Sequence, residues 1–269
     1  MEGVLVHVLR RVNDFNRSVL EVLTAMRDQF GFYTGCLNLY DALRAVKAPV
    51  CFPELDAAPG TFLLHQLSDV FLALKQGKMP VTNDVNLNGI RLCLIMGSNQ
   101  GGKTTFLRSV GIAQIMAQSG LFVAAMDCHT SIYPVILTHF PGSEDSMLKA
   151  GLLEQELTAL ADRIDHLQQG SLLLLNETFA TTTVGEGSIL AEEVTRALRD
   201  AGVISLFVTH LYPFARRLYE ARGSNPDVAF LRAERLNDGL RTYRLRQGEP
   251  LATSYGYDLY DHQLSDLFN

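Results

Sequence analysis

The feature that most constrains this chain is a glycine-rich segment near its middle that ends in a lysine and a threonine. It reads Gly97, Ser98, Asn99, Gln100, Gly101, Gly102, Lys103 and Thr104. This order matches the pattern G-x-x-x-x-G-K-[ST]. A continuous apolar run over 90–96 precedes the segment, and a helix-like pattern over 103–119 follows it. A strand, such a loop and a helix in this order are typical of phosphate-binding α/β domains.

The residue types of the segment suit a triphosphate. Glycines let the backbone curl so that successive N–H groups point at phosphate oxygens. The start of the following helix adds the positive end of its dipole. We expect Lys103 to reach the β- and γ-phosphates and the Thr104 hydroxyl to bind Mg²⁺. Thr105 comes next and is counted among the nucleotide contacts. The predicted ligands are therefore ATP and Mg²⁺.

Two later apolar runs end in polar residues that can serve the same site. The run over 172–175 is followed by Asn176 and Glu177, and a carboxylate in the position of Glu177 can act as a general base toward water. Asn176 stands where such sites usually carry an aspartate. Its amide oxygen can accept a hydrogen bond from a metal-bound water but brings no charge, so we expect weaker Mg²⁺ affinity. The run over 203–209 leads to His210, which can sense a terminal phosphate or hold the water.

Strand-like and helix-like segments alternate after about residue 61, which indicates an α/β domain with a mainly parallel sheet. Further strands are expected at 61–64, 133–138 and 228–233, and helices at 146–169, 187–201 and 213–222. Residues 4–46 contain no proline and repeat apolar residues at three-to-four spacing, which indicates a helical segment within 1–50. We expect Gly31 and Gly35 to divide it into two helices, and the proline-bearing stretch 49–60 to end it.

Composition excludes some classes of function. A net charge of -6 argues against a protein that mainly coats nucleic acid, because lysine and arginine supply most non-specific affinity for DNA. The four cysteines contain no C-x-x-C pair, so they indicate neither a zinc site nor a disulfide framework. The apolar runs are of strand length, which predicts no membrane span and a cytoplasmic protein.

The elements together resemble the ATPase domain of the MutS family of DNA mismatch-repair proteins. Members carry G-P-N-M-G-G-K-S/T, and this chain keeps all but the second and fourth letters. Residues 209–210 match the T-H that closes the family's histidine strand, and residues 254–256 match a later S-Y-G. Residues 80–87 resemble the family segment that lies along the adenine, which makes Val81 an expected base contact.

The resemblance covers about 61–258. It implies an ABC-type ATPase domain over 61–269, preceded by a segment, 1–50, that resembles the end of the family's core-helix domain and lacking the mismatch-recognition domain. It also implies a homodimer in which the second subunit completes each ATP site, with DNA bound through absent or separate regions. The family serine that touches the partner's γ-phosphate corresponds to Gly151. That contact must then come from backbone N–H groups, from Lys149 or Ser146, or be missing.

Two functions stay open at this level. The first is an ATP-binding and hydrolysing motor domain of a MutS-like mismatch-repair or DNA-remodelling protein, closed as a dimer by ATP. The alternative is a nucleotide-dependent switch or scaffold with little hydrolysis, which Asn176 and Gly151 favour. A small-molecule kinase on a related fold is disfavoured, because the T-H and S-Y-G elements are typical of the ABC-like arrangement.

Overall fold

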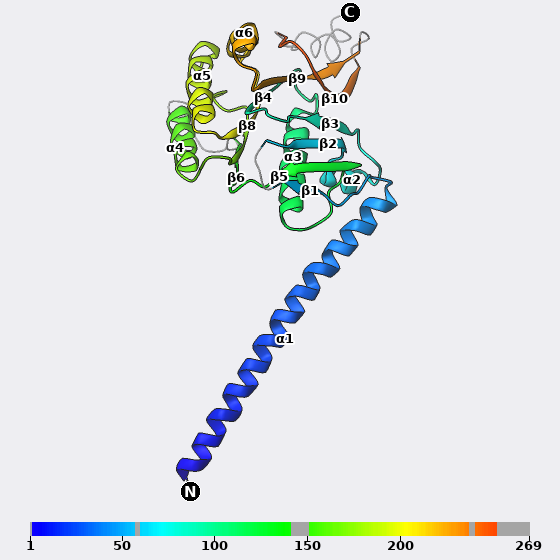
Figure 1. Ribbon diagram of the computed structural model, residues 1–269, viewed down its shortest axis with the longest axis vertical. Helices are drawn as coiled ribbons and strands as arrows, with labels where there is room; N and C mark the ends of the chain where they lie inside the picture. Colours follow the sequence, from blue (N-terminus) through cyan, green and yellow to red (C-terminus); the bar gives the residue numbers. More distant parts are fainter. Residues whose placement is uncertain (1, 57–59, 141–150, 237–239, 252–269) are drawn as a thin grey trace, which may run out of the picture.

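The computed structural model describes residues 2–56, 60–140, 151–236 and 240–251 (Figure 1). Within these residues the chain forms one long helix, α1, and an α/β body that contains two sheets. Residues 146, 149 and 254–256, singled out in the sequence, lie outside the described residues.

The larger sheet has six strands in the order β10-β9-β4-β8-β7-β6. The bounds are β4 Leu92–Met96, β6 Ile136–His139, β7 Leu172–Asn176, β8 Ile204–Val208, β9 Val228–Arg235 and β10 Arg241–Gln247. Four of its five pairings are parallel, and only β10 runs antiparallel, against β9. All of the expected strands except the one at 61–64 lie in this sheet. The sheet is mixed rather than purely parallel, because β10 is antiparallel to β9.

The central strands β4, β8 and β7 of the six-stranded sheet are buried on both faces, and β4 shows how. Leu92, Leu94 and Met96 belong to one apolar cluster, whereas Cys93 and Ile95 belong to another on the opposite face. Helix α3 covers the face of Cys93, and helices α4, α5 and α6 cover the other. The helices are α3 Lys103–Gln118, α4 Leu152–Ile164, α5 Val184–Asp200 and α6 Tyr212–Glu220, followed by the short 3-10 helix η1 Arg222–Ser224. A strand covered on both faces needs apolar residues at successive positions, which explains the continuous runs in the sequence.

A second, four-stranded sheet in the order β1-β5-β2-β3 corrects the expectation of a single sheet. Its strands are β1 Glu54–Asp56, β2 Phe62–Leu67, β3 Asn83–Asn86 and β5 Asp127–Ser131, with helix α2 Val70–Gln76 between β2 and β3. The pairings of β2 with β3 and with β5 are antiparallel, and that of β1 with β5 is parallel. Its inner side chains share one core with α3, which therefore packs between the two sheets.

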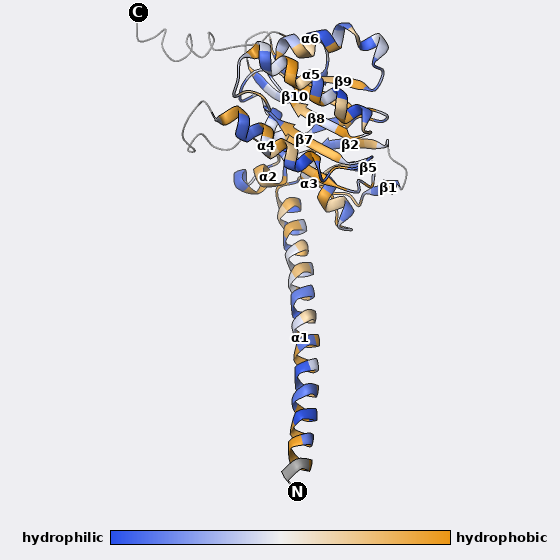
Figure 2. Cartoon of the chain, turned by 90° about the vertical axis from the view of Figure 1, so that its left-hand side faces the viewer, coloured by the Kyte–Doolittle hydropathy of each residue, from blue (hydrophilic) through white to orange (hydrophobic). Residues whose placement is uncertain are grey.

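Helix α1 spans Glu2–Ala45 without interruption, so the predicted break at Gly31 and Gly35 is wrong. An isolated glycine costs a helix only about 1 kcal/mol, and this stretch contains no proline to end it. The last turns dock on the body, where Leu43 is buried and Tyr40 meets Phe122 edge to face. The remainder projects from the body with many apolar side chains exposed (Figures 1 and 2). Among the described helices, none is long and apolar enough to cross a membrane.

Candidate nucleotide-binding site

The glycine-rich loop connects the end of β4 to the start of α3, as the sequence predicts. Gly97 has φ +127, and a Cβ there would lie 2.7 Å from the Ala233 Cβ on β9. Gly102 is the N-cap of α3 with φ +89. Both positions therefore need glycine, one for the close approach of β9 and both for a backbone conformation that other residues rarely adopt.

The Lys103 side chain folds back over the loop. It is only 5% exposed, and its Nζ donates to the carbonyl oxygens of Gly97 and Ser98, each at 2.9 Å. Burial lowers the pKa of Lys103, and the nearby charge of Glu177 opposes that shift. Among the described residues, the N–H groups of Asn99 and Gln100 have no hydrogen-bond partner. An anion at this loop would therefore meet free amides and an ammonium group held in place.

A hydrogen bond joins the start of α3 to the end of β7. The Thr104 hydroxyl donates to Asn176 Oδ1 at 2.9 Å. An aspartate oxygen can accept the same bond, so the amide preserves the geometry and omits the negative charge. The structure thus brings together the two residues that the sequence nominates for Mg²⁺. Both offer oxygen atoms, which are the ligands that Mg²⁺ prefers.

Glu177 follows at the carboxyl end of β7, in the left-handed region with φ +52. Its N–H donates to the carbonyl oxygen of Val208 on β8 at 2.7 Å. The residue is half-buried and lines the same cavity as Lys103. Glu177 therefore shares one cavity with Lys103 and with the glycine-rich loop, and its charge acts on the Lys103 ammonium group.

The cavity has a volume of about 740 Å³, within the range of ligand pockets, about 300–1,000 Å³. One end is formed by the loop and the first turn of α3, including Thr105. The other end is formed by α2 and the segment after it, where Val81 is 42% exposed and lines the wall. Val81, the predicted contact for the adenine base, therefore lies in the same cavity as residues of the glycine-rich loop.

Tyr243 also lines this cavity, although no sequence pattern selects it. It lies on β10 at an irregularity in the pairing with β9 and has φ +58. Asn83 of β3 holds this part of β10, because its Nδ2 donates to Tyr243 O at 3.3 Å and its Oδ1 accepts from Leu245 N at 2.7 Å. The surrounding strand is mostly polar and has no motif, so only the fold reveals the aromatic wall.

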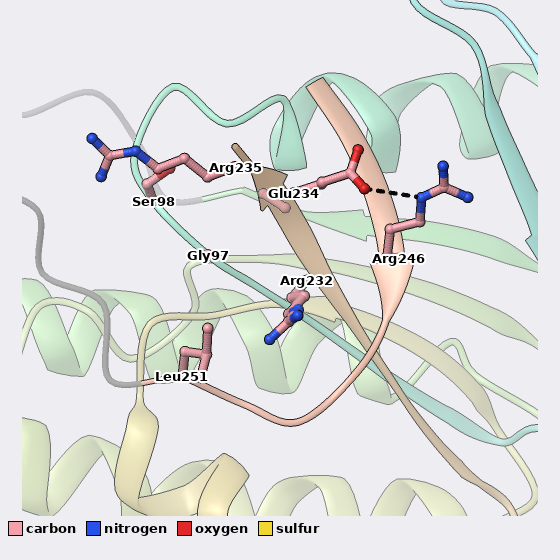
Figure 3. A pocket seen from close by; sticks show the side chains of 8 residues that line it. Gly97, Ser98, Arg232, Glu234, Arg235, Arg246 and Leu251 are labelled. Atoms are coloured by element: carbon pink, nitrogen blue, oxygen red, sulfur yellow. Dashed lines mark hydrogen bonds and ion pairs between the residues drawn. The ribbon is translucent and has the colours of Figure 1, made fainter. Parts of the chain in front are cut away.

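Gly97 and Ser98 line a second, smaller hollow of about 150 Å³ (Figure 3). Its other walls come from the ends of β9 and β10 and from Leu251, and one of its arginines, Arg246, pairs with Glu234 at 3.4 Å. In Figure 3 the arginine side chains of this hollow point in different directions. Neither Lys103 nor Glu177 lines this smaller hollow, whereas both line the larger cavity together with the loop.

His210 lies two residues beyond the end of β8 and is exposed. It is not among the residues that line the larger cavity. The preceding Thr209 is buried, with its N–H donating to Ile95 O at 3.1 Å and its hydroxyl accepting from Leu211 N at 3.1 Å. The strand end is therefore fixed beside the loop, and the role predicted for the histidine stays a prediction.

Residues 93–261, well over half of the chain, match the sequence family MutS domain V. The chain belongs to the MutS family. The matched region of this MutS-family chain includes β4 from its second residue onward, the glycine-rich loop, Asn176, Glu177 and Tyr243.

Individual relatives agree with this membership. The chain is 29% identical over 249 residues to DNA mismatch repair protein MSH7 of Arabidopsis thaliana, covering 79% of this chain and 21% of the relative. It is 24% identical over 274 aligned residues to DNA mismatch repair protein MutS of Bacillus pumilus, covering 97% and 31%. It is 30% identical over 174 residues to DNA mismatch repair protein Msh3 of Homo sapiens, covering 63% and 15%. The chain thus spans between about a sixth and a third of the length of these relatives.

Proposed function

We propose that this chain is the ATP-binding and hydrolysing motor domain of a MutS-like DNA mismatch-repair or DNA-remodelling protein, of the ABC type, that works as an ATP-closed dimer. The observation that carries this proposal is the shared cavity of Lys103 and Glu177, with Thr104 and Asn176 joined by a hydrogen bond beside it. Membership of the MutS family supports the same function.

In this proposal the loop binds the triphosphate. Free loop amides and the Lys103 ammonium hold the β- and γ-phosphates, which requires Nζ to exchange its bonds to Gly97 and Ser98 for phosphate oxygens. The base extends along the cavity toward Val81 and Tyr243. Thr104 and Asn176 are the residues that would hold Mg²⁺, which supplies neutralisation of phosphate charge when bound.

In the hydrolysis step of this proposal, Glu177 acts as the general base. A water oxygen forms a bond to the γ-phosphorus while the bond from that phosphorus to the bridging oxygen breaks. Glu177 accepts the proton of the water, and the leaving ADP takes the bridging oxygen and its electron pair. Lys103 stabilises the negative charge that spreads over the phosphate oxygens.

Two parts of this proposal, closure of a dimer and a role in DNA repair, are supported by the resemblance to the MutS family. Relatives are called DNA mismatch repair proteins, and by resemblance Gly151 faces the partner's nucleotide. Gly151 is the N-cap of α4 and has no side chain to offer, so a contact from it to the partner's phosphate would use main-chain N–H groups. Helix α1, about 65 Å long at 1.5 Å per residue, is suited to carry a movement of the body to attached regions.

The second candidate is an ATP-dependent switch with little turnover. The neutral Asn176 favours it, because it accepts the Thr104 hydrogen bond but brings no charge to the metal. Such a protein would bind ATP, and ATP would control which partners it binds, but it would hydrolyse ATP only slowly.

The test compares ATP affinity, steady-state turnover and mass in solution for the wild type, Lys103→Ala and Glu177→Ala. We expect Lys103→Ala to lose ATP binding, and Glu177→Ala to bind ATP, form a dimer and lose turnover. Lys75→Ala and Glu54→Ala are matched controls, because both residues are exposed and neither lines the cavity. ATP binding without turnover in the wild type would favour the switch, and absence of ATP binding would reject both candidates. Retention of mismatched duplex by the ATP-bound protein tests the DNA assignment.

A further inference from the structure

We propose that Glu156, on the helix α4, is a positioning residue that sets the orientation of Glu177 by holding the turn that follows it. The inference rests on the proposed function for its catalytic consequence. The holding of the turn is a separate structural claim that can be measured without ATP.

Both oxygens of the Glu156 carboxylate bind the turn. Oε1 accepts from the main-chain N–H of Phe179 at 2.8 Å, and Oε2 accepts from the Thr181 hydroxyl at 2.6 Å. The two bonds join residues more than 20 positions apart in sequence. Charge-assisted hydrogen bonds of this kind are about twice as strong as neutral ones.

The turn needs such support because its backbone is unfavourable. Glu177 and Phe179 both have positive φ, at 52° and 67°. A residue other than glycine is strained in this conformation, and the conformation persists only where the surrounding structure fixes it. The Phe179 ring is fully buried in the core on the α4 side of the sheet. Its carbonyl oxygen would lie 2.7 Å from a Cβ at Gly187 of α5. The turn is therefore held between α4 and α5 with no spare room.

Glu156 is itself buried, at 8% exposure. Burial raises the pKa of its carboxyl, but His139 and the hydrogen bonds from Thr181 and Phe179 outweigh it, so the pKa lies below its usual range. His139 is also buried, and its Nε2 lies 3.7 Å from Glu156 Oε1. A buried carboxylate is costly unless its oxygens are bonded. Here they are satisfied mainly by the turn, which links the ionised state of Glu156 to the position of Glu177.

The link to the site is short. Glu177 is two residues from Phe179, and its carbonyl oxygen accepts from Ala180 N at 3.2 Å within the same turn. On the other side, its N–H is fixed to β8. Glu156 touches neither the cavity nor Lys103, so its influence on water or phosphate must pass through the turn.

The experiment measures kcat, KM and ATP affinity for Glu156→Leu and Glu156→Gln. A displacement near 1 Å can lower turnover about a hundredfold, so we expect Glu156→Leu to lower kcat by about that factor while ATP affinity stays within about threefold. Glu156→Gln keeps an acceptor for the Phe179 N–H and should recover part of the loss. Leu160→Ala is the control, because it removes buried packing from the same helix and leaves both hydrogen bonds intact.

A double-mutant cycle tests whether Glu156 acts through Glu177. In the Glu177→Ala background, Glu156→Leu should lower the residual rate no further. The positioning role would be overturned if Glu156→Leu lowered the rate by the same factor in the Glu177→Ala background as in the wild type. It would also be overturned if Leu160→Ala, at equal stability, lowered kcat as much as Glu156→Leu does. Hydrogen exchange of the Phe179 amide provides a readout without turnover, and we expect faster exchange in Glu156→Leu. Unchanged protection rejects the claim that Glu156 holds the turn, whereas a wild type that hydrolyses no ATP rejects the proposed function instead.

Discussion

Gly111→Ala in α3 sets two effects of known size against each other. Alanine favours a helix by about 1 kcal/mol over glycine. A Cβ at position 111, however, would lie 2.7 Å from the Leu174 Cδ1, and carbon atoms pack at about 3.5–4.0 Å. Leu174 is buried in β7, the strand that carries Asn176 and Glu177. Either α3 and β7 move apart, or Leu174 leaves its preferred rotamer.

Overpacking of this kind costs about 1–3 kcal/mol. The clash therefore exceeds the gain in helix propensity, and we expect Gly111→Ala to destabilise the protein by about 1 kcal/mol. The melting temperature should fall by about 2–4 °C for a domain of this size. Urea and thermal unfolding followed by circular dichroism measure the change, with Gly185→Ala as the control. Gly185 lies in α5 with nothing within 4 Å of its added Cβ, so that substitution should stabilise.

The cause is isolated by shortening the neighbouring side chain. Leu174→Val removes the clashing atom and costs about 1 kcal/mol by itself. In that background Gly111→Ala should raise the stability, because only the helix propensity is left. The reasoning is refuted if Gly111→Ala stabilises the wild-type protein as Gly185→Ala does, or if the two substitutions are simply additive.

Three further predictions concern Mg²⁺ binding, binding of the adenine base, and the dependence of stability on pH. Asn176→Asp adds a negative charge without removing the Thr104 hydrogen bond, so we expect Mg²⁺-dependent ATP binding to tighten about tenfold; an unchanged Mg²⁺ titration contradicts this. Tyr243→Ala should weaken ATP about tenfold but leave tripolyphosphate affinity unchanged, measured by calorimetry. Burial raises the pKa of Asp227, but Arg199 outweighs it and holds the pKa below the ordinary 3.8. The pair therefore stabilises the fold above about pH 4, and this contribution disappears as the pH falls through the lowered pKa. Arg199→Met should make acid unfolding less steep there, and an identical acid profile would count against it.

Local patterns in the sequence identify the parts of the site that lie on buried strands. Strands β4, β7 and β8 are covered on both faces, so their apolar runs stand out, and the polar residues after them mark the strand ends. The glycines of the loop are equally visible, because Gly97 and Gly102 have backbone conformations that few other residues adopt. Local residue patterns and the family resemblance are therefore sufficient to select Asn176, Glu177 and Val81.

The second sheet could not be predicted in this way. Strand β5 reads DCHTS and β3 reads NDVN, which are polar and short. Strand β5 also pairs with a strand that is distant in the sequence, since Phe62 of β2 lies opposite Thr130 of β5. The continuity of α1 through Gly31 and Gly35 likewise depends on the absence of a strong breaker rather than on a positive signal.

The sequence alone determined the family, the loop and the acidic strand end, because each depends on the residue types within one short segment. Tertiary structure decided which distant side chains lie at or near the candidate site: Tyr243 from β10 lines the cavity, and Glu156 from α4 binds the turn after Glu177. These contacts join segments that are separated along the chain, and their geometry depends on how both sheets and their helices pack. No local pattern of residues contains that information.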